Sequence, residues 1–433
     1  MSEPITITLP PAAGAPAAGA PAAGTPAAGA APSTAGAVDG AATRAALLAA
    51  ARALTPAVRA ARHAIEGQRR LPPALVQAMT AAGLFRLLRP RSLGGLEVEP
   101  QTHLALIEEV ARVDASAAWL LQTNNGGLVA AWLDPAGARA VYAGDPDAIV
   151  GGTLVPRGQA LVVPGGYRIS GRWPFASGVE HCAWMAVAAT VVDGAGQPAL
   201  RPGGAPEVRA CFIPAGAYTI LDTWSVGGLR GTGSHDILVQ DVFVPRELSC
   251  VLDGRAPAGH PGPLYAFPAW SLGSAALATV CLGAARGALD ALIAQAQVEP
   301  GAAPPGMPPA PPLRERAALH AQVGRAEALL GAARAYVLDA VADAWQTALA
   351  GRPIGAPQRA RIRLAATHAG ASAVQVVDLA ESAAGSAALY TTSPLERAFR
   401  DVHAAVHHFN LQPWTYEAAG RVLLGLPASG PPL

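Results

Sequence analysis

A chain of 433 residues, 51% of them hydrophobic, is long enough for two or three domains around a substantial core. The formal net charge is +1 and all 31 basic residues are arginine, without a basic stripe, so a nucleic-acid partner is poorly supported. The lack of lysine excludes a Schiff-base nucleophile and a lysine-dependent phosphate-binding loop.

Residues 1–41 are of low complexity and repeat the unit PAAG[A/T]. A proline at every fifth position prevents a helix from propagating, and the segment contains few side chains able to form a core. We therefore expect a disordered tail that is dispensable for folding and activity. The charged and apolar pattern of a secretory signal is also missing, which favours a cytoplasmic protein.

Residues 42–145 show helical periodicity. One helical segment is expected to open with Leu71-Pro72-Pro73 and to stop at Gly83. A later helix has Asp114 or Ser116 as its N-cap. The helix between them carries apolar residues along one face, namely Leu104, Ile107, Val110 and Ala111.

The rhythm changes at 146–255, where short β-rich runs alternate with glycine and proline. These runs are 161–163, 184–192, 208–213 and 237–244. They predict antiparallel strands in a small barrel or sandwich. Residues 256–433 are again helical, with a proline-rich loop at 300–312, and the uncharged stretch 265–285 is interpreted as a buried helix rather than a membrane span. The fold class is therefore mainly α with a central β domain.

Several common site motifs are missing. The glycine-rich run 227–233 lacks the spacing of a dinucleotide-binding turn, so we interpret it as a flexible loop. His403 and His407 have i, i+4 spacing, but no carboxylate follows at ligand spacing, and we predict no metal site. The cysteines are also too widely spaced for a zinc site or a disulfide framework. They are Cys182, Cys211, Cys250 and Cys281.

Four runs resemble segments of the acyl-CoA dehydrogenase family, in the same order along residues 42–425. They are LFRL at 84–87, WPFASG at 173–178, the run 222–245 ending in VFVP, and SPLERAFRD at 393–401. The resemblance implies an N-terminal helical lobe, a small antiparallel β-barrel or sandwich and a C-terminal four-helix bundle. It also implies a homotetramer assembled through the C-terminal helices.

Within that family, the phrase RWxFASG is more similar to the two-component flavin monooxygenases than to the dehydrogenases. That similarity implies reduced flavin, FMNH2 or FADH2, delivered by a separate reductase. It further implies O2 as co-substrate, a flavin C4a-hydroperoxide, and oxygenation of a small aromatic, sulfur or nitrogen compound.

The resemblance also assigns site residues. The catalytic residues that it implies are His408 and Ser177, with His407 as the alternative histidine. The residues implied to bind the flavin are Trp173, Phe175, Ser177 and Arg400. The residues implied to line the substrate pocket are Asn124, Asn125 and Phe409. Ser177 is expected near flavin N5, and a neutral histidine can protonate the peroxide or accept a substrate proton. Asn124 and Asn125 cannot exchange a proton at neutral pH, so neither can be the base that deprotonates a phenol. This weakens a phenol-hydroxylase interpretation and leaves sulfur or nitrogen oxygenation open.

Two alternatives stay open at this point. An acyl-CoA dehydrogenase needs a carboxylate base beside its flavin. The positions where that base is usual in the family correspond here to Phe409, or to His408 after a one-residue slip, and to Gly273, so no acid is present. A dehydrogenase with a relocated base, or a non-catalytic member of the family, would also fit the fold.

Overall fold

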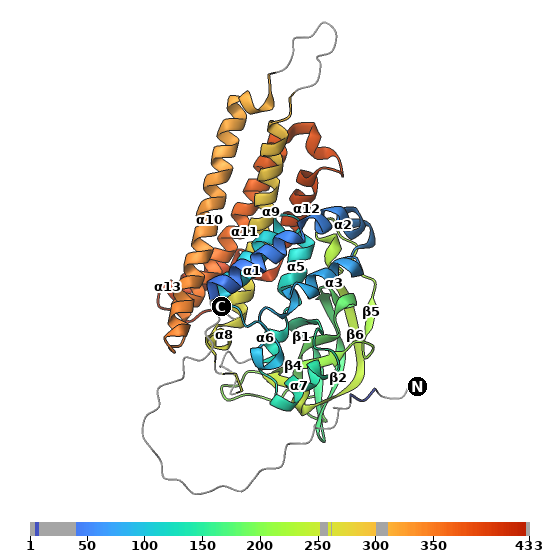
Figure 1. The fold of residues 1–433 in the computed structure, drawn as a ribbon. Helices are drawn as coiled ribbons and strands as arrows, with labels where there is room; N and C mark the ends of the chain where they lie inside the picture. Colours follow the sequence, from blue (N-terminus) through green and yellow to red (C-terminus); the bar gives the residue numbers. More distant parts are fainter. Residues whose placement is uncertain (1–4, 8–39, 252–258, 261, 300–310, 430–433) are drawn as a thin grey trace, which may run out of the picture.

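The computed structural model describes residues 5–7, 40–251, 259–260, 262–299 and 311–429. The sheet lies at one side of the molecule, the N-terminal helices lie next to it, and the longest helices, from the C-terminal region, stand beside them as a bundle (Figure 1). The order helical, β, helical agrees with the sequence analysis.

The N-terminal region is helical and its local signals behave as expected. Asp114 accepts a hydrogen bond from the Ala117 N–H at 2.9 Å and caps α5, and Gly83 adopts a positive φ of 77° just after α3. The helices are α1 (Gly40–Ala53), α2 (Thr55–Gln68), α3 (Pro73–Ala81), α4 (Pro100–Ala111), α5 (Ala115–Thr123), α6 (Gly127–Ala130) and α7 (Pro135–Ala143).

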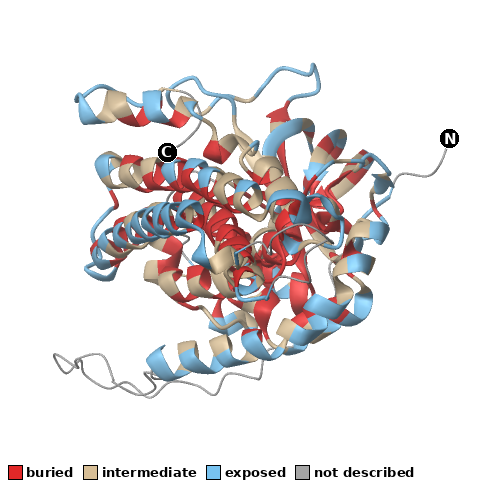
Figure 2. Cartoon of the chain, turned by 90° about the horizontal axis from the view of Figure 1, so that it is seen from above, coloured by how far each residue is buried: buried red, intermediate tan, exposed pale blue. Residues whose placement is uncertain are grey.

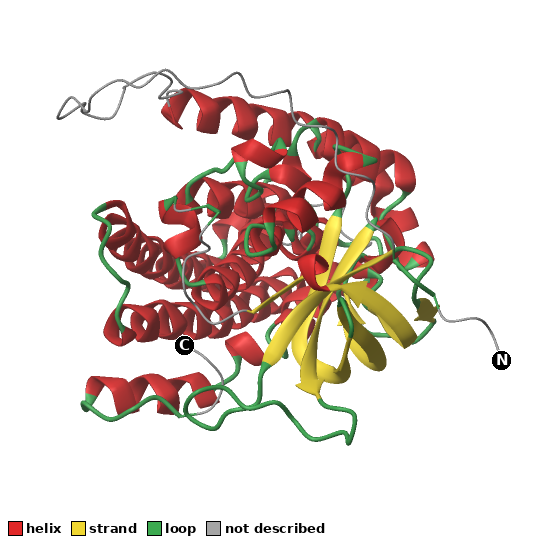
Figure 3. Ribbon diagram, turned by 90° about the horizontal axis from the view of Figure 1, so that it is seen from below, coloured by secondary structure: helices red, strands yellow, loops and turns green. Residues whose placement is uncertain are grey.

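The β region forms one sheet with strand order β5-β6-β2-β1-β3-β4-β7. The strands are β1 (Val150–Val163), β2 (Gly166–Ala176), β3 (Trp184–Val192), β4 (Val208–Pro214), β5 (Thr219–Leu221), β6 (His235–Pro245) and β7 (Ser249–Val251). They gather in one curled layer beside the helices (Figure 3). Glycines allow close approach within this layer, because a Cβ at Gly158 would lie 2.3 Å from the Trp173 ring.

The expected antiparallel barrel or sandwich was wrong in detail. The sheet is open and mixed, since β1 pairs with β2 in an antiparallel hairpin but with β3 in parallel. The chain leaves β2, passes the turn that contains Ser177, and returns on the other side of β1, and this crossover makes the pair parallel. Periodicity within each run carries no information about that choice.

The expected disorder of residues 1–41 was wrong at one point. Residues 5–7 lie along β6, where Ile7 N–H donates to the Phe243 carbonyl at 3.3 Å and the Ile7 side chain is buried. All three residues, Ile5, Thr6 and Ile7, are β-branched, which suits this strand pairing. The remainder of the tail, 8–39, lies outside the described residues, as do 1–4.

The C-terminal region is dominated by long helices. They are α8 (Pro263–Ala266), α9 (Ala269–Ala296), α10 (Ala317–Leu349), α11 (Ala356–Ala384), α12 (Pro394–Ala405) and α13 (Trp414–Leu423). α9 packs against α11, α12, α4 and α5, so its small side chains are used within the chain. Most of the proline-rich loop, 300–310, lies outside the described residues.

α9 is the core helix of the molecule. It is the one described helix long and apolar enough to cross a membrane, and 72% of its most apolar window is buried inside the fold. Buried residues line the central helices and the sheet, whereas the outer helices are exposed on one side (Figure 2). The burial is that of a core helix, as the interruption by Pro268 and the small residues predicted.

Candidate active site

Trp119 on α5 joins the β domain to the C-terminal segment. Its indole N–H donates to the Ser177 hydroxyl at 3.2 Å, and its ring meets the His408 ring edge-on, with centroids 5.7 Å apart. α5 can make both contacts because it packs against α9 on one side and against the turn η4 (Arg230–Thr232) on the other. The structure thus brings together Ser177 and His408, the two residues expected to carry the chemistry.

The Ser177 hydroxyl belongs to a chain of hydrogen bonds that runs in one direction. Thr232 donates its hydroxyl proton to the Leu229 carbonyl, which only accepts, at 2.9 Å. Ser234 therefore donates to Thr232 at 2.6 Å, and Ser177 donates to Ser234 at 2.7 Å. Because Trp119 donates to Ser177, one lone pair of the Ser177 oxygen is left to accept a further hydrogen bond.

The glycine-rich run 227–233 holds this chain in place and is not the flexible loop that we expected. Gly231, Thr232 and Gly233 are all buried, and Gly233 has a positive φ of 49°. A Cβ at Gly231 would lie 2.0 Å from the Ile65 side chain, so the turn requires a glycine there.

Asn124 and Asn125 support the site from behind and do not present free amides to a substrate. Asn124 donates to the Ser177 carbonyl at 3.3 Å and to Cys182 Sγ at 2.7 Å. Asn125 accepts from the Leu87 N–H and donates to two main-chain carbonyls. The geometry therefore does not support the expected substrate-pocket role, and their inability to exchange protons is no argument against a phenolic substrate.

Trp173 and Phe175 have different environments despite their closeness in sequence. Trp173 is fully buried and donates to the Ala188 carbonyl at 2.7 Å, so it packs the sheet and the geometry does not support direct flavin contact. Phe175 is 66% exposed with a positive φ of 60°, and it meets Trp224 edge-on. Strain at a bulky residue that is then left exposed is typical of a ligand-contacting position.

His408 has a defined tautomer. The Asn410 N–H donates to His408 Nδ1 at 3.2 Å, so in the neutral ring the proton lies on Nε2. Phe409 stacks on the ring with centroids 4.8 Å apart, and Trp270 at the start of α9 meets Phe409 edge-on. His408 thus offers an N–H donor within an aromatic surround.

Burial, reinforced by the positive charge of Arg363, lowers the pKa of His408 to about 4. The imidazole is therefore neutral across the physiological range. If His408 titrated at its ordinary value, ligand binding or turnover by wild type would show a step near pH 6.5 that His408→Gln lacks. We expect no such step. A pH profile of both proteins tests this, and a step near 6.5 confined to the wild type would contradict it.

The folded-state pKa of His408 lies below the ordinary value of 6.5, so the unfolded chain binds more protons between about pH 4 and 6.5. His408 consequently favours folding above that window and weakens it as the pH falls through it.

His407 and Arg400 lie elsewhere than expected. α12 ends at Ala405, so His407 sits in the following turn, is exposed, and does not share a helical face with His403. The Arg400 guanidinium binds the carboxylates of Glu396 and Glu66 and the carbonyl of Gly227. These contacts favour a role for Arg400 in holding α12 against α2 and against the glycine-rich run. The geometry supports neither Arg400 as a flavin ligand nor His407 as the catalytic histidine.

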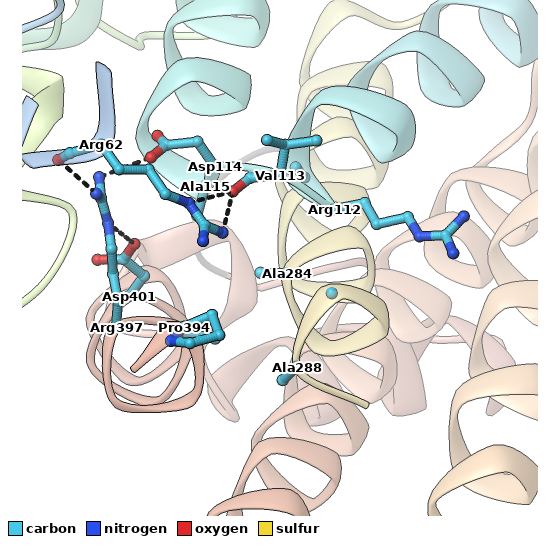
Figure 4. Close-up of a pocket in the computed structure, with 13 residues that line it drawn as sticks. Arg62, Arg112, Val113, Asp114, Ala115, Ala284, Ala288, Pro394, Arg397 and Asp401 are labelled. Atoms are coloured by element: carbon cyan, nitrogen blue, oxygen red, sulfur yellow. Dashed lines mark hydrogen bonds and ion pairs between the residues drawn. The ribbon is translucent and has the colours of Figure 1, made fainter. Parts of the chain in front are cut away.

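A neighbouring cluster of buried charged residues connects α12 with the start of α5 and with the turn η4 (Figure 4). Arg397 on α12 pairs with Asp114 at 2.7 Å and lies 3.6 Å from Asp401, and Asp401 accepts from the Leu229 N–H at 2.6 Å. The adjacent cavity, also lined by Arg62, is about 20 Å³, room for little more than one water. The cluster therefore holds α5, α12 and the turn η4 in register around the site.

Sequence reasoning missed several residues of the site: Trp119, Thr232, Ser234, Trp270, Arg363 and Asn410. Trp119 lies within the helix expected after Asp114, and nothing in the sequence analysis assigned it to the site. Thr232 lay in the run interpreted as flexible, and Ser234 follows that run directly. The only signal in the sequence was these two hydroxyl residues at the end of the glycine-rich run, and their direction of donation requires coordinates.

Comparison with known proteins identifies the family. Residues 42–140 match the model "Acyl-CoA dehydrogenase, N-terminal domain" and 275–413 match "Acyl-CoA dehydrogenase, C-terminal domain". The chain is 32% identical over 359 residues to an indole-3-acetate monooxygenase of Pseudomonas putida, covering 83% of this chain and 88% of that protein. It is 30% identical over 391 residues to the flavin-dependent monooxygenase oxygenase subunit HsaA of Mycobacterium tuberculosis, covering 88% and 96%.

The chain belongs to the flavin-dependent monooxygenases of the acyl-CoA dehydrogenase family. Among solved structures, XiaF from Streptomyces sp., in complex with FADH2 and glycerol, superposes with a TM-score of 0.83 at 27% identity, covering 91% of this chain and 99% of XiaF. This monooxygenase is therefore an oxidoreductase that uses reduced flavin and O2, as the sequence predicted, and not an acyl-CoA dehydrogenase or a non-catalytic relative.

Proposed function

We propose that this monooxygenase inserts one oxygen atom of O2 into a small aromatic substrate, with Ser177 contacting the reduced flavin and His408 contacting the substrate side. The observation that carries the assignment is the one-directional hydrogen-bond chain through Ser177. Its free lone pair fits a donor, and N5 of a reduced flavin carries a hydrogen whereas N5 of an oxidised flavin does not. The flavin, when bound, supplies the activation of O2.

The residues of this chain fit such a group. Phe175, exposed and held by a strained backbone, offers an apolar face close to the Ser177 turn, with Trp224 beside it. Whether FMN or FAD is used depends on contacts beyond the ring. We infer FADH2 from the ligand in XiaF.

The aromatic character of the substrate follows from the walls of the site. Trp119, Phe409 and Trp270 succeed one another around His408 by edge and stacking contacts. Such rings pack well against another aromatic ring. A relative that is named for indole-3-acetate, an aromatic compound, supports this choice over oxygenation at sulfur or nitrogen.

We further propose a separate flavin reductase as partner, since the HsaA relative is named an oxygenase subunit.

A homotetramer is proposed on exposed apolar residues and not on the small-residue helix faces. The small-residue faces of α9 and α11 pack against each other within the chain, but Leu389, Tyr390, Leu423 and Leu424 are exposed in the C-terminal region. Sedimentation tests the assembly. A cytoplasmic location agrees with four buried, unpaired cysteines.

The flavin role is tested by affinity for the two redox states. Wild type is expected to bind reduced flavin tighter than oxidised flavin, and Ser177→Ala is expected to reduce that preference by about five- to tenfold, because one hydrogen bond is lost. Anaerobic titration with reduced FAD and aerobic titration with oxidised FAD give the two dissociation constants. An equal loss for both states would show that Ser177 only maintains the fold.

The oxygenase assignment has its own test. Reduced FAD, O2 and a panel of aromatic compounds should give an oxygenated product with wild type. Anaerobic bleaching of bound FAD by an acyl-CoA would contradict the proposal.

A further inference from the structure

Leu229, which precedes the turn η4, has a backbone conformation that needs support from its surroundings. Its φ is 52°, in the left-handed region that a residue with a Cβ rarely adopts, and its side chain is buried. The Leu229 N–H donates to Asp401 Oδ1 at 2.6 Å, and Asp401, on α12, is only 2% exposed. Because a hydrogen bond to a carboxylate is strong in a buried place, Asp401 stabilises this conformation.

α12 contacts the glycine-rich run at a second point, one residue earlier in both segments. A Cβ at Gly228 would overlap the Arg400 carbonyl oxygen, so the run lies with its backbone directly against the helix backbone. The other carboxylate oxygen, Asp401 Oδ2, lies 3.6 Å from Arg397 Nε on the same helix. The carboxylate is therefore held from its own helix and offers Oδ1 to Leu229.

The Leu229 carbonyl is the end point of the hydrogen-bond chain that contains Ser177. It accepts from the Thr232 hydroxyl at 2.9 Å, and Ser234 connects Thr232 to Ser177. The Thr232 carbonyl in turn accepts from the Gly178 N–H at 2.8 Å, directly after Ser177. A shift of Leu229 therefore moves Thr232 and, with it, both the side chain and the main chain of the Ser177 turn.

The same carbonyl also fixes the aromatic residues at the proposed flavin site. The Trp224 indole N–H donates to it at 3.1 Å, and the Trp224 ring meets the exposed Phe175 ring edge-on. These two residues form an aromatic wall. Leu229 thus holds both parts of the site that the proposed function places against the flavin, the Ser177 hydroxyl and the aromatic wall.

We propose that Asp401 is a positioning residue for the flavin. It holds Leu229 in the left-handed conformation, and through the Leu229 carbonyl it keeps the Ser177 hydroxyl and the aromatic wall in their places. Asp401 acts through Leu229 and not by contact with the flavin. The inference rests on the proposed function for the position of the flavin, but the hold of Asp401 on the turn is testable in the flavin-free chain.

Two variants of Asp401 separate its hydrogen bond from its charge. Asp401→Ala removes the acceptor of the Leu229 N–H, whereas Asp401→Asn keeps an oxygen for it. Both remove the same negative charge, and both leave Arg397 its ion pair with Asp114 at 2.7 Å. Thr232→Val breaks the same hydrogen-bond chain one step further along and therefore tests the route.

The first measurement is the preference for reduced over oxidised FAD, taken as the ratio of the two dissociation constants. Asp401→Ala is expected to reduce the preference of wild type by about three- to tenfold, because the Ser177 acceptor is no longer held in place. Asp401→Asn is expected to reduce it by less than about twofold. The double variant Asp401→Ala/Thr232→Val should lose no more than the larger of the two single losses, since both substitutions act on one chain.

The second measurement needs no flavin. Hydrogen exchange of the main-chain amides in residues 227–234 is followed by mass spectrometry on the full chain. Exchange there should be at least about tenfold faster in Asp401→Ala than in wild type and close to wild type in Asp401→Asn. β3 is the internal reference, and its exchange should be the same in all three proteins.

The inference is overturned if Asp401→Ala keeps the flavin preference of wild type, or if its two single losses with Thr232→Val are fully additive. Exchange that accelerates equally in β3 would show that Asp401 only stabilises the fold. If Asp401→Ala does not fold, Asp401→Asn decides: a loss of preference above about threefold overturns the inference, and retention with slow exchange in 227–234 supports it.

Failure of the proposed function has a different signature. Wild type and Ser177→Ala would then show the same ratio of dissociation constants for the two redox states, while Asp401→Ala still accelerates exchange in residues 227–234. That outcome overturns the flavin-positioning role of Asp401 together with the proposed contact of Ser177, and leaves Asp401 as the support of Leu229 alone.

Discussion

Replacing His408 with leucine is expected to lower the yield of oxygenated product about a hundredfold or more. The Nε2–H that the structure orients is one donor in an enclosed aromatic site, and removal of such a donor typically costs about 10²–10³ in rate. His408→Gln retains an amide N–H at a similar reach and is expected to lose less than about tenfold. The measurement is product formed and hydrogen peroxide released per reduced flavin.

The pair of variants separates two roles for the same residue. Glutamine donates a hydrogen bond but cannot accept and return a proton at neutral pH. If His408→Gln lowers the product yield as much as His408→Leu does, and both variants bind reduced flavin as wild type does, then His408 transfers a proton and the donor role is wrong. Retained activity in His408→Leu would exclude His408 from the chemistry.

Arg397→Met is expected to reduce the free energy of unfolding by about 3–5 kcal/mol. It would leave Asp114 and Asp401 buried without the guanidinium that now lies between them, and removal of one partner of a buried ion pair costs about that much. Chemical denaturation monitored by tryptophan fluorescence measures the change. The matched control is Arg361→Met, whose pair with Asp339 is exposed and should cost less than about 1 kcal/mol.

The loss should depend on pH. Burial raises the pKa of Asp401 to about 7, above the unfolded value of 3.8, so the folded state binds more protons between these values. Its contribution to stability is therefore present at low pH and is lost as the pH rises toward 7. The Arg397→Met defect should be larger at pH 8 than at pH 5, because protonation neutralises the stranded Asp401 carboxyl at the lower pH. An equal defect at both values would contradict burial of charge as its cause.

This cluster and the site depend on the same assembly. Asp114 both caps α5 and pairs with Arg397, and α5 carries Trp119. The R-x-x-R-D segment at 397–401 was expected to bring Arg400 to the flavin. Its observed contacts instead fix α12 against the start of α5, against α2 and against the turn η4, so we expect any effect on the chemistry to be exerted through the positions of Trp119 and of the turn η4.

The sequence alone could determine the features that depend on neighbours along the chain. The Asp114 cap, the glycine that follows α3 and the burial of α9 all follow from spacing and composition over a few turns. The order of the helical, β and helical regions also followed from the periodicity, whereas the family resemblance added the use of reduced flavin, and both were confirmed. The roles of Ser177 and His408 stay predictions, although the structure brings the two residues together through Trp119.

Tertiary structure decided everything that depends on which distant groups share a hydrogen bond. Residues 58 positions apart meet at the Trp119–Ser177 contact, and the direction of donation through Ser177 is fixed only where Thr232 meets a carbonyl. The tautomer of His408 depends on the same kind of contact, at Asn410. The parallel pairing of β1 with β3 was likewise settled by the crossover, because alternation within a strand specifies its faces but not its neighbour.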